Sequence, residues 1–349
     1  MTRRLALVAL VALLALAGTA HSPRPAAAQT GTYRVVFVGD ISPPTNETKG
    51  DDNATAELIV KLNPDAIGLL GDVQYEQGSG AMFASPVGFD GTYGRLVKNR
   101  VRFPAVGNHD VADPGPGAPG FNAYFRDALT GLPCQNDPIP CHPERGYYVI
   151  DLDANRDGTP DWFVTALNSN CQRVSGGTGD TATPSCADQG EQANWLRSVY
   201  NARHGGATSG RKCSLALWHH ERWGTGFFAD DPATTYLWGV LNHYHGDIVF
   251  AGHSHSVARM GPMTYGGTLA ADGGGIRQIT SGAGGRSLTP FRVALRTGTR
   301  YRANDAYQVE QLTLHVSQSS AGWQGGSWDH SFQRVDGTVV DQASAGCWP

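Results

Sequence analysis

Five apolar segments of this 349-residue sequence each stop at a glycine or at a side chain that can bind a metal ion. The segments are residues 33–38, 66–70, 102–106, 213–218 and 247–250, and we interpret them as β-strands. Their ends are followed by Gly39-Asp40, Gly71-Asp72, Gly107-Asn108-His109-Asp110, His219-His220 and Ala251-Gly252-His253-Ser254-His255. Ligand sites of α/β sheets lie outside the carboxyl ends of the strands, so we expect these polar residues to meet in space.

Helices are expected between the strands, as in an α/β fold. Residues 54–62 have a helical pattern with Asn53 as a plausible N-cap, and residues 189–202 predict a second helix. Further strands are expected at 146–152, 162–167, 277–280, 308–316 and 327–332. The sequence contains no long linker and no internal repeat, so residues 30–349 are expected to form one domain.

The first 28 residues have the pattern of a secretory signal peptide. Arg3-Arg4 precede an unbroken small and apolar run, residues 5–18, which is too short to span a bilayer as a helix. Ala26-Ala27-Ala28 then offers small residues for a signal peptidase. Arg3-Arg4 also fits a twin-arginine signal, although a basic n-region is the simpler interpretation. We expect a secreted or extracytoplasmic protein with no membrane span in the mature chain.

The composition excludes several classes of protein. Charged residues make up 17%, the residues AVILMFWYC make up 40%, and the formal net charge is −4. These values exclude a coiled coil and a charge-driven disordered chain, and they give no support for binding to nucleic-acid phosphates. A loop-rich globular enzyme fits them, as do the 45 glycines. The sequence carries no signal for an oligomeric state.

Six cysteines in the expected mature chain suggest disulfides, because an even count accompanies an export signal. Six cysteines allow 15 pairings, so the sequence leaves the connectivity open. Proximity along the chain favours Cys134–Cys141 and Cys171–Cys186, which leaves Cys213–Cys347. No pair forms a CxxC motif, which argues against a zinc–thiolate site.

The side chains after the strands provide oxygen and nitrogen ligands without sulfur. Two Asp, one Tyr, one Asn and three His are too many donors for one tetrahedral zinc ion. Two neighbouring metal ions that share one carboxylate would use all of them. Two-metal sites of this kind suit displacement at phosphorus.

The order GD…GDxxY…GNHD…H…GHxH resembles that of the calcineurin-like metallophosphoesterases, and Gly71-Asp72-Val73-Gln74-Tyr75 is similar to the purple acid phosphatase branch. The resemblance runs from Asp40 to His255. It implies a four-layer α/β/β/α sandwich of the α/β class, with the metal ions at the joint edge of two sheets. It also implies hydrolysis of phosphate esters by attack of a metal-bound hydroxide.

The resemblance assigns a role to each residue of the pattern. The first metal would be held by Asp40, Asp72, Tyr75 and His255, and the second by Asp72, Asn108, His219 and His253. A Tyr75 phenolate favours ferric iron, with iron, zinc or manganese as the divalent partner. His109 would donate a proton to the leaving oxygen or stabilise its charge, and Asp110 would orient His109 through a hydrogen bond.

Two positions depart from the branch. Ser42 stands where glycine is usual, and Glu221 replaces a proline in the segment that contains His219. His220 follows the expected ligand His219 directly. Two interpretations of His220 remain open: it reaches the phosphate, or it only packs.

A separate segment resembles a calcium loop. Asp153, Asn155, Asp157 and Asp161 place oxygen donors at spaced positions around Gly158. A complete loop would need an acid at position 164, which is a valine. The alternative is a hairpin turn rich in Asp, Asn and Gly between two strands.

The function that these observations favour is hydrolysis of small phosphate monoesters. One alternative keeps the site and changes the substrate to phosphodiesters or nucleotides. The other is a secreted metal-binding protein that is catalytically dead. The intact His109 and the complete ligand set argue against the second alternative.

Overall fold

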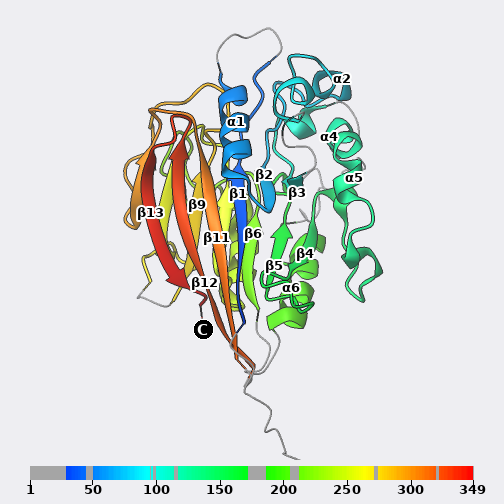
Figure 1. The fold of residues 1–349 in the computed structure, drawn as a ribbon, viewed down its shortest axis with the longest axis vertical. Coiled ribbons are helices and arrows are strands. Elements are labelled where there is room, and N and C mark those ends of the chain that lie inside the picture. The colour runs from blue at the N-terminus through cyan, green and yellow to red at the C-terminus, as the bar shows by residue number, and fades with distance from the viewer. Residues whose placement is uncertain are drawn as a thin grey trace, which may run out of the picture.

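Two mixed β-sheets form the centre of the computed structural model (Figure 1). The first sheet has the order β13 (Val339–Gly346), β12 (Gly322–Arg334), β11 (Gln308–Ser319), β1 (Gln29–Val38), β2 (Ala66–Leu70) and β3 (Val101–Ala105). The second has the order β10 (Thr299–Ala303), β8 (Val257–Met263), β9 (Ile276–Ser281), β7 (Ile248–Ala251), β6 (Cys213–Leu217), β5 (Trp162–Ala166) and β4 (Tyr148–Leu152).

The structure describes residues 29–44, 50–94, 96, 100–113, 117–171, 186–204, 212–270, 274–319 and 322–348. The expected signal peptide, residues 1–28, lies outside these described residues.

In both sheets, the strands that precede the polar segments of the sequence run parallel to one another. In the first sheet β1, β2 and β3 run parallel, and in the second β5, β6, β7 and β9 run parallel. Their central members are buried along their whole length, as in Ala66–Leu70, Trp162–Ala166 and Cys213–Leu217. Continuous apolar segments are typical of parallel strands that are covered on both faces. This burial explains why the sequence shows unbroken apolar runs rather than alternation.

The sheets pack against each other, and helices cover their outer faces. Phe37 of β1 stacks on Phe250 of β7 with ring centroids 3.8 Å apart, which joins the two sheets. Helix α1 (Asp52–Leu62) lies in front of the first sheet in Figure 1. On the second sheet, Tyr200 of α6 (Glu191–His204) contacts Phe163 of β5, and Trp238 of α7 (Thr235–His243) contacts Trp218. The expected four-layer α/β/β/α sandwich is confirmed.

Short helices fill the connection after β2 and β3. They are α2 (Gly80–Phe83), α4 (Pro119–Tyr124) and α5 (Arg126–Leu129). Aromatic side chains of α2, of α4 and of Phe125 between α4 and α5 pack together: Phe83 stacks on Tyr124 at 4.9 Å, and the Phe121 and Phe125 rings lie 4.7 Å apart. The cluster forms a small apolar unit beside the ends of β2 and β3.

The predicted N-cap of α1 is wrong. The helix begins at Asp52, and the carboxylate of Asp51 accepts a hydrogen bond from the backbone N–H of Ala54 at 3.2 Å. Asn53 therefore lies inside the first turn. Aspartate and asparagine are equally good caps, so the sequence alone did not separate the two positions.

All three predicted disulfides are confirmed. Cys134–Cys141, Cys171–Cys186 and Cys213–Cys347 have Cα–Cα distances of 5.5, 5.2 and 5.7 Å. The third joins β6 to the end of the chain, after β13, and so ties the two sheets together.

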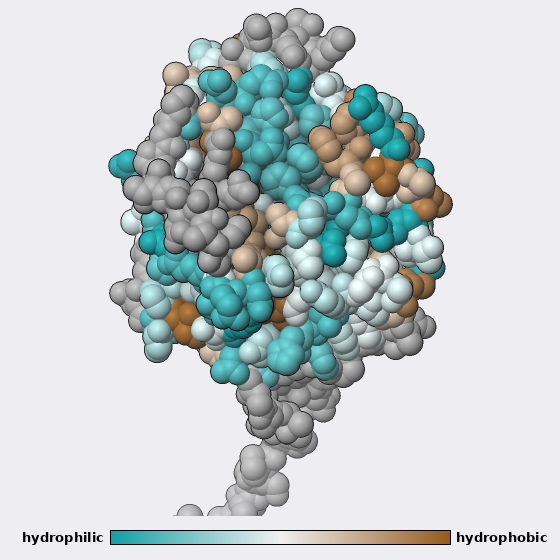
Figure 2. Space-filling model, turned by 180° about the vertical axis from the view of Figure 1, so that it is seen from behind, coloured by the Kyte–Doolittle hydropathy of each residue, from teal (hydrophilic) through white to brown (hydrophobic). Residues whose placement is uncertain are grey.

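The rear face of the molecule is mainly hydrophilic (Figure 2). Outside the grey atoms, hydrophobic residues form only small, separate patches on this face. Among the described helices, none is long and apolar enough to cross a membrane.

Candidate metal centre

The polar residues after five strands lie together where the two sheets meet. From the first sheet, Asp40 follows β1, Asp72 and Tyr75 follow β2, and Asn108 and His109 follow β3. From the second sheet, His219 and His220 follow β6, and His253 and His255 follow β7. Hydrogen-bond distances link residues that are up to 213 positions apart in the sequence. The structure thus brings together all seven predicted ligands.

Three of these residues have left-handed backbone conformations. The φ angles are 57° at Asp40, 47° at Asp72 and 70° at His253. Such angles cost a non-glycine residue about 1–2 kcal/mol and concentrate at functional sites. Each of the three directly follows a glycine. The chain therefore turns sharply at the strand ends and aims these side chains into the space between the sheets.

We call Asp40, Tyr75 and His255 the first ligand set. The Tyr75 hydroxyl donates to Asp40 Oδ1 at 2.8 Å and lies 3.1 Å from His255 Nε2. His255 Nε2 is 3.5 Å from Asp40 Oδ1. Asp40 and Tyr75 are buried, and Asp40 Oδ2 accepts the backbone N–H of His253 at 2.8 Å. The donor atoms of the set converge on one small volume.

We call Asn108, His219 and His253 the second ligand set. His219 Nε2 lies 3.0 Å from Asn108 Oδ1 and 3.2 Å from His253 Nδ1. The Phe228 ring stacks on His253 with a centroid distance of 3.9 Å, which holds that imidazole from its outer side.

Asp72 touches both sets. One carboxylate oxygen, Oδ2, is 3.1 Å from the Tyr75 hydroxyl and 3.1 Å from His219 Nε2. The other oxygen, Oδ1, accepts the backbone N–H of His109 at 2.7 Å. One ligand atom each of Asp40, Asp72 and His219 lies within 4.8 Å of the other two, which is close enough for the three to hold one metal ion. A carboxylate between two groups of donors is the geometry that a bridging ligand requires.

Backbone carbonyls fix the protons of two imidazoles. His219 Nδ1 is 2.8 Å from the Leu70 carbonyl, and His255 Nδ1 is 2.8 Å from the Ser287 carbonyl. A carbonyl oxygen can only accept, so Nδ1 carries the hydrogen in both rings. In the neutral rings Nε2 therefore holds a lone pair, which is the form that binds metal ions.

The buried carboxylates of the centre favour the binding of cations. Burial raises the pKa of Asp40 well above its usual value, although the charge of His219 opposes this. Burial would also raise the pKa of Asp72, but the charge of His219 and its hydrogen bond lower it below the usual range. Burial and the charges of both carboxylates raise the pKa of Tyr75. Metal ions would compensate the buried carboxylates, and the oxygen–nitrogen donor set suits hard to borderline ions.

The predicted hydrogen bond between Asp110 and His109 is wrong. The Asp110 carboxylate accepts backbone N–H groups of Gly107 at 2.8 Å and Val73 at 3.1 Å. His109 Nδ1 instead lies 2.7 Å from the Glu76 carbonyl oxygen. Asp110 is buried behind the loops that carry Asp72 and Asn108, where its carboxylate holds their backbones. Burial and the charge of Asp72 raise the pKa of Asp110 to about 7.

Several residues at the centre were not predicted from the sequence. Ser169, three residues after β5, contacts the segment of His219 and His220. Arg286 lies over the Tyr75 ring at 5.1 Å and pairs with Glu76 at 3.0 Å. Ser169 stands two residues after the predicted strand at 162–167, so the rule that located the candidate ligands would also have pointed to it. Nothing in the sequence around Arg286 singles it out.

The aspartate-rich segment forms the turn between β4 and β5. The Asp153 carboxylate accepts the backbone N–H groups of Asp157 at 3.1 Å and Gly158 at 2.7 Å. Asp157 in turn accepts the N–H of Thr159 at 2.8 Å. These contacts are those of a polar hairpin turn, the alternative interpretation. Calcium at Asp153, Asn155, Asp157 and Asp161 stays a prediction.

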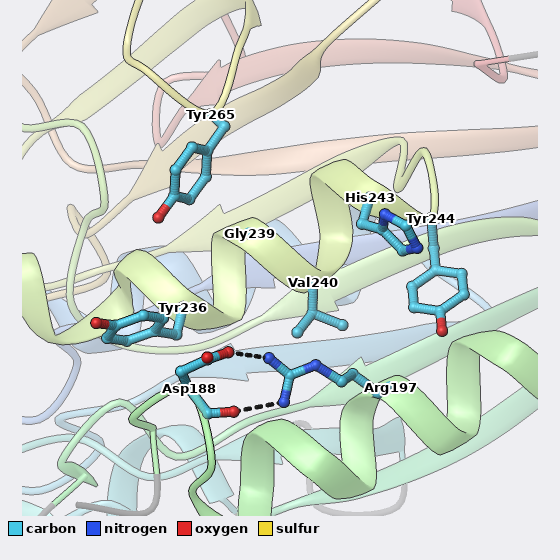
Figure 3. Close-up of a pocket in the computed structure, with 8 residues that line it drawn as sticks. All are labelled: Asp188, Arg197, Tyr236, Gly239, Val240, His243, Tyr244 and Tyr265. Atoms are coloured by element: carbon cyan, nitrogen blue, oxygen red, sulfur yellow. Dashed lines mark hydrogen bonds and ion pairs between the residues drawn. The ribbon is translucent and has the colours of Figure 1, made fainter.

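A larger cavity of about 520 Å³ lies away from the metal centre, beside α6 and α7 (Figure 3). An ion pair between Asp188 and Arg197 lines one side of it, and Tyr236 and Tyr265 lie on other sides. A cavity of about 320 Å³ adjoins the second ligand set and is lined by Asn108 and His220, among others. The smaller cavity is the one that a substrate at the metal centre would use.

Comparison with known proteins shows a family match and a similar fold. Residues 33–257 match the calcineurin-like phosphoesterase family, which is more than half of the chain. A search of curated proteins found no match. The fold is similar to that of purple acid phosphatase PPD1 from yellow lupin (Lupinus luteus) seeds, with a TM-score of 0.65 and 16% identity over 93% of this chain. This chain spans only 55% of the lupin protein.

A second similar structure is GAP50, described as the anchor in the inner membrane complex of Plasmodium. Its TM-score is 0.59 at 13% identity, over 91% of this chain and 89% of GAP50. At such identities both likenesses concern the fold.

Proposed function

Because this chain belongs to the calcineurin-like phosphoesterase family, we propose that it hydrolyses phosphate monoesters with the help of two metal ions. The observation that supports this is the arrangement of the two ligand sets around Asp72, whose Oδ2 lies 3.1 Å from a donor of each set. Family membership alone does not decide the activity, since the same fold occurs in a protein described as an anchor.

The first ligand set and Asp72 would hold one ion, and the second ligand set and Asp72 would hold the other. When bound, such a pair lowers the pKa of a water molecule and neutralises charge on the attacked phosphoryl group. We propose ferric iron at the first ligand set, because Tyr75 offers a phenol oxygen, and a divalent ion of iron, zinc or manganese at the second. The tautomers of His219 and His255 leave Nε2 ready for these ions.

His109 is proposed as the residue that assists the leaving oxygen. Its Nδ1 is held by the Glu76 carbonyl at 2.7 Å, and its Nε2 lies 4.0 Å from Asp72 Oδ2. About 30% of the side chain is exposed, so the ring is open to a substrate. With a proton on Nε2 it would donate to the leaving oxygen or stabilise its charge. Glu76, rather than Asp110, is the positioning residue for this ring.

We also propose that the protein acts outside the cytoplasm as one domain, residues 30–349, after removal of residues 1–28. The three disulfides support an oxidising compartment. Small phosphate esters are the proposed substrates. Calcium at the β4–β5 turn remains a subsidiary proposal.

Phosphodiesters and nucleotides are the alternative substrates on the same site, and a catalytically dead metal-binding protein is the other alternative. The test uses purified protein reconstituted with iron, manganese or zinc. Rates are compared for p-nitrophenyl phosphate and bis(p-nitrophenyl) phosphate, with an Asp72→Asn variant as the control. A higher kcat/KM for the monoester that disappears in the variant is expected. Faster diester hydrolysis would change the substrate class, and an inert wild type with both metals bound would contradict the proposal.

A further inference from the structure

His220 is an imidazole at the metal centre that belongs to neither ligand set. Its ring centroid lies 4.9 Å from that of His219 and 4.5 Å from that of His253. A ring nitrogen of each of the three lies within 4.8 Å of the others. Proximity alone would therefore allow His220 to be an additional metal ligand. Its hydrogen bonds show whether a ring nitrogen is available to bind a metal ion.

Ser169 determines which nitrogen of His220 carries the proton. The Ser169 hydroxyl oxygen accepts the backbone N–H of His219 at 3.2 Å and that of His220 at 3.0 Å. These two bonds use both of its acceptor positions, so its hydrogen remains for a third partner. That partner is His220 Nδ1, 2.8 Å away. Ser169 is buried, which restricts the hydroxyl to these partners.

The resulting tautomer is the opposite of that of the ligands. His219 and His255 donate from Nδ1 to carbonyls and keep a lone pair on Nε2. His220 accepts at Nδ1, so its neutral ring carries hydrogen on Nε2. An Nε2–H group cannot bind a metal ion, but it can donate a hydrogen bond.

The His220 ring also lies where a substrate would bind. It lines the 320 Å³ cavity together with Asn108 of the second ligand set. Ser169, Asn170 and Asp231 contribute further polar lining. A phosphoryl group at the second ligand set would therefore come within reach of this imidazole.

We propose that His220 is a catalytic residue that donates a hydrogen bond from Nε2 to a phosphoryl oxygen of the bound ester, and that Ser169 is the positioning residue that fixes this tautomer. The inference rests on the proposed function and deepens it, because it concerns a phosphate bound at the same centre. It resolves the two interpretations left open by the sequence in favour of contact with the phosphate.

The experiment measures binding of inorganic phosphate to zinc-loaded protein by calorimetry, because this readout does not require turnover. The variants are His220→Ala, His220→Gln, which can still offer an N–H near the position of Nε2, and His243→Ala as a control on the exposed face of α7. Metal content and kcat/KM for p-nitrophenyl phosphate are measured on the same samples. A ¹⁵N NMR spectrum of the imidazoles, assigned by comparison with His220→Gln, reports the tautomer.

We expect two metal ions per chain in every variant and an Nε2–H tautomer for His220. Hydrogen bonds to charged groups contribute about 1.5–3 kcal/mol, so His220→Ala should bind phosphate roughly 10- to 100-fold more weakly. His220→Gln should recover part of this affinity, and His243→Ala should match the wild type.

Unchanged phosphate affinity in His220→Ala would overturn the proposal. So would loss of a metal ion, which would make His220 a ligand, or an equal loss in the Ala and Gln variants, which would indicate a packing role. A wild type that binds phosphate but hydrolyses no ester would refute the proposed function alone, since the affinity ratio would still test His220.

Discussion

Gly107→Ala should damage the metal centre without changing a single ligand. A Cβ atom at position 107 would lie 2.1 Å from the backbone nitrogen of Asp72 and 2.2 Å from its Oδ1. Ordinary contacts begin near 3.4 Å, so Asp72 or its neighbours would have to move by about 1 Å. His219 and the backbone N–H of His109 hold Asp72 on its other sides, which leaves it little room to relax.

Such a displacement of the shared carboxylate disturbs both ligand sets at once. A misplacement of about 1 Å can lower activity about 10²-fold, and overpacking costs about 1–3 kcal/mol of stability. We expect fewer than two metal ions per chain by elemental analysis and about a 100-fold lower kcat/KM for p-nitrophenyl phosphate.

The matched control is Gly80→Ala, because a Cβ atom there has no neighbour within 4 Å. Neither position requires a positive φ, so the comparison isolates steric overlap from backbone strain. A Gly107→Ala protein with two metal ions and wild-type activity would show that the added Cβ atom does not displace Asp72.

Three further predictions concern iron, pH and covalent links. Tyr75→Phe should remove any visible absorption band of the iron-loaded protein and lower its ferric content; an unchanged spectrum would show that Tyr75 is not a ligand. Burial would lower the pKa of His330, but the charge of Glu310, 2.6 Å away, raises it from 6.5 to about 9. The stabilisation that this raised pKa represents should be lost as the pH rises through 9, because the imidazole then loses its charge beside Glu310 and Asp341, so thermal melts of His330→Gln should depend less on pH there. Replacing Cys213 and Cys347 by Ser opens a loop of 134 residues and should lower the free energy of unfolding by about 5 kcal/mol, against about 3 kcal/mol for the loop of 15 residues; equal losses in urea titrations would contradict the loop-entropy argument.

The grouping of the candidate ligands was predictable because each follows a strand that is buried on both faces. Such strands appear in the sequence as unbroken apolar runs, and Asp40, Asp72 and His253 each stand one glycine beyond a strand end. Parallel strands end at one edge of a sheet, so residues that follow different strands in the sequence lie close together in space. The disulfides were predictable because two of the pairs are close along the chain.

Exposed or interrupted elements were missed for the opposite reason. Strand β13 is mostly exposed and has no apolar periodicity, and β8 contains Gly261-Pro262, which has the pattern of a turn. Helix α7 is short and begins at Thr235, where no side chain caps it. These elements form because they pair or pack with strands and helices that are distant in the sequence, such as β12 beside β13, and that information is not local.

Hydrogen-bond partners were the least predictable feature of the site. The sequence places Asp110 beside His109, yet the chain turns so that Asp110 holds backbone amides and Glu76 holds His109. The tautomer of His220 depends on Ser169, 51 residues away in the sequence. A motif specifies which side chains are present, whereas their partners depend on the path of the loops.

We propose that the two ligand sets share Asp72 and hold two neighbouring metal ions. Anomalous X-ray diffraction from crystals of protein purified without chelator tests it most directly. We expect two anomalous peaks about 3.5–4 Å apart, one within each ligand set and both beside Asp72. A single ion, or two ions bound elsewhere, would contradict it.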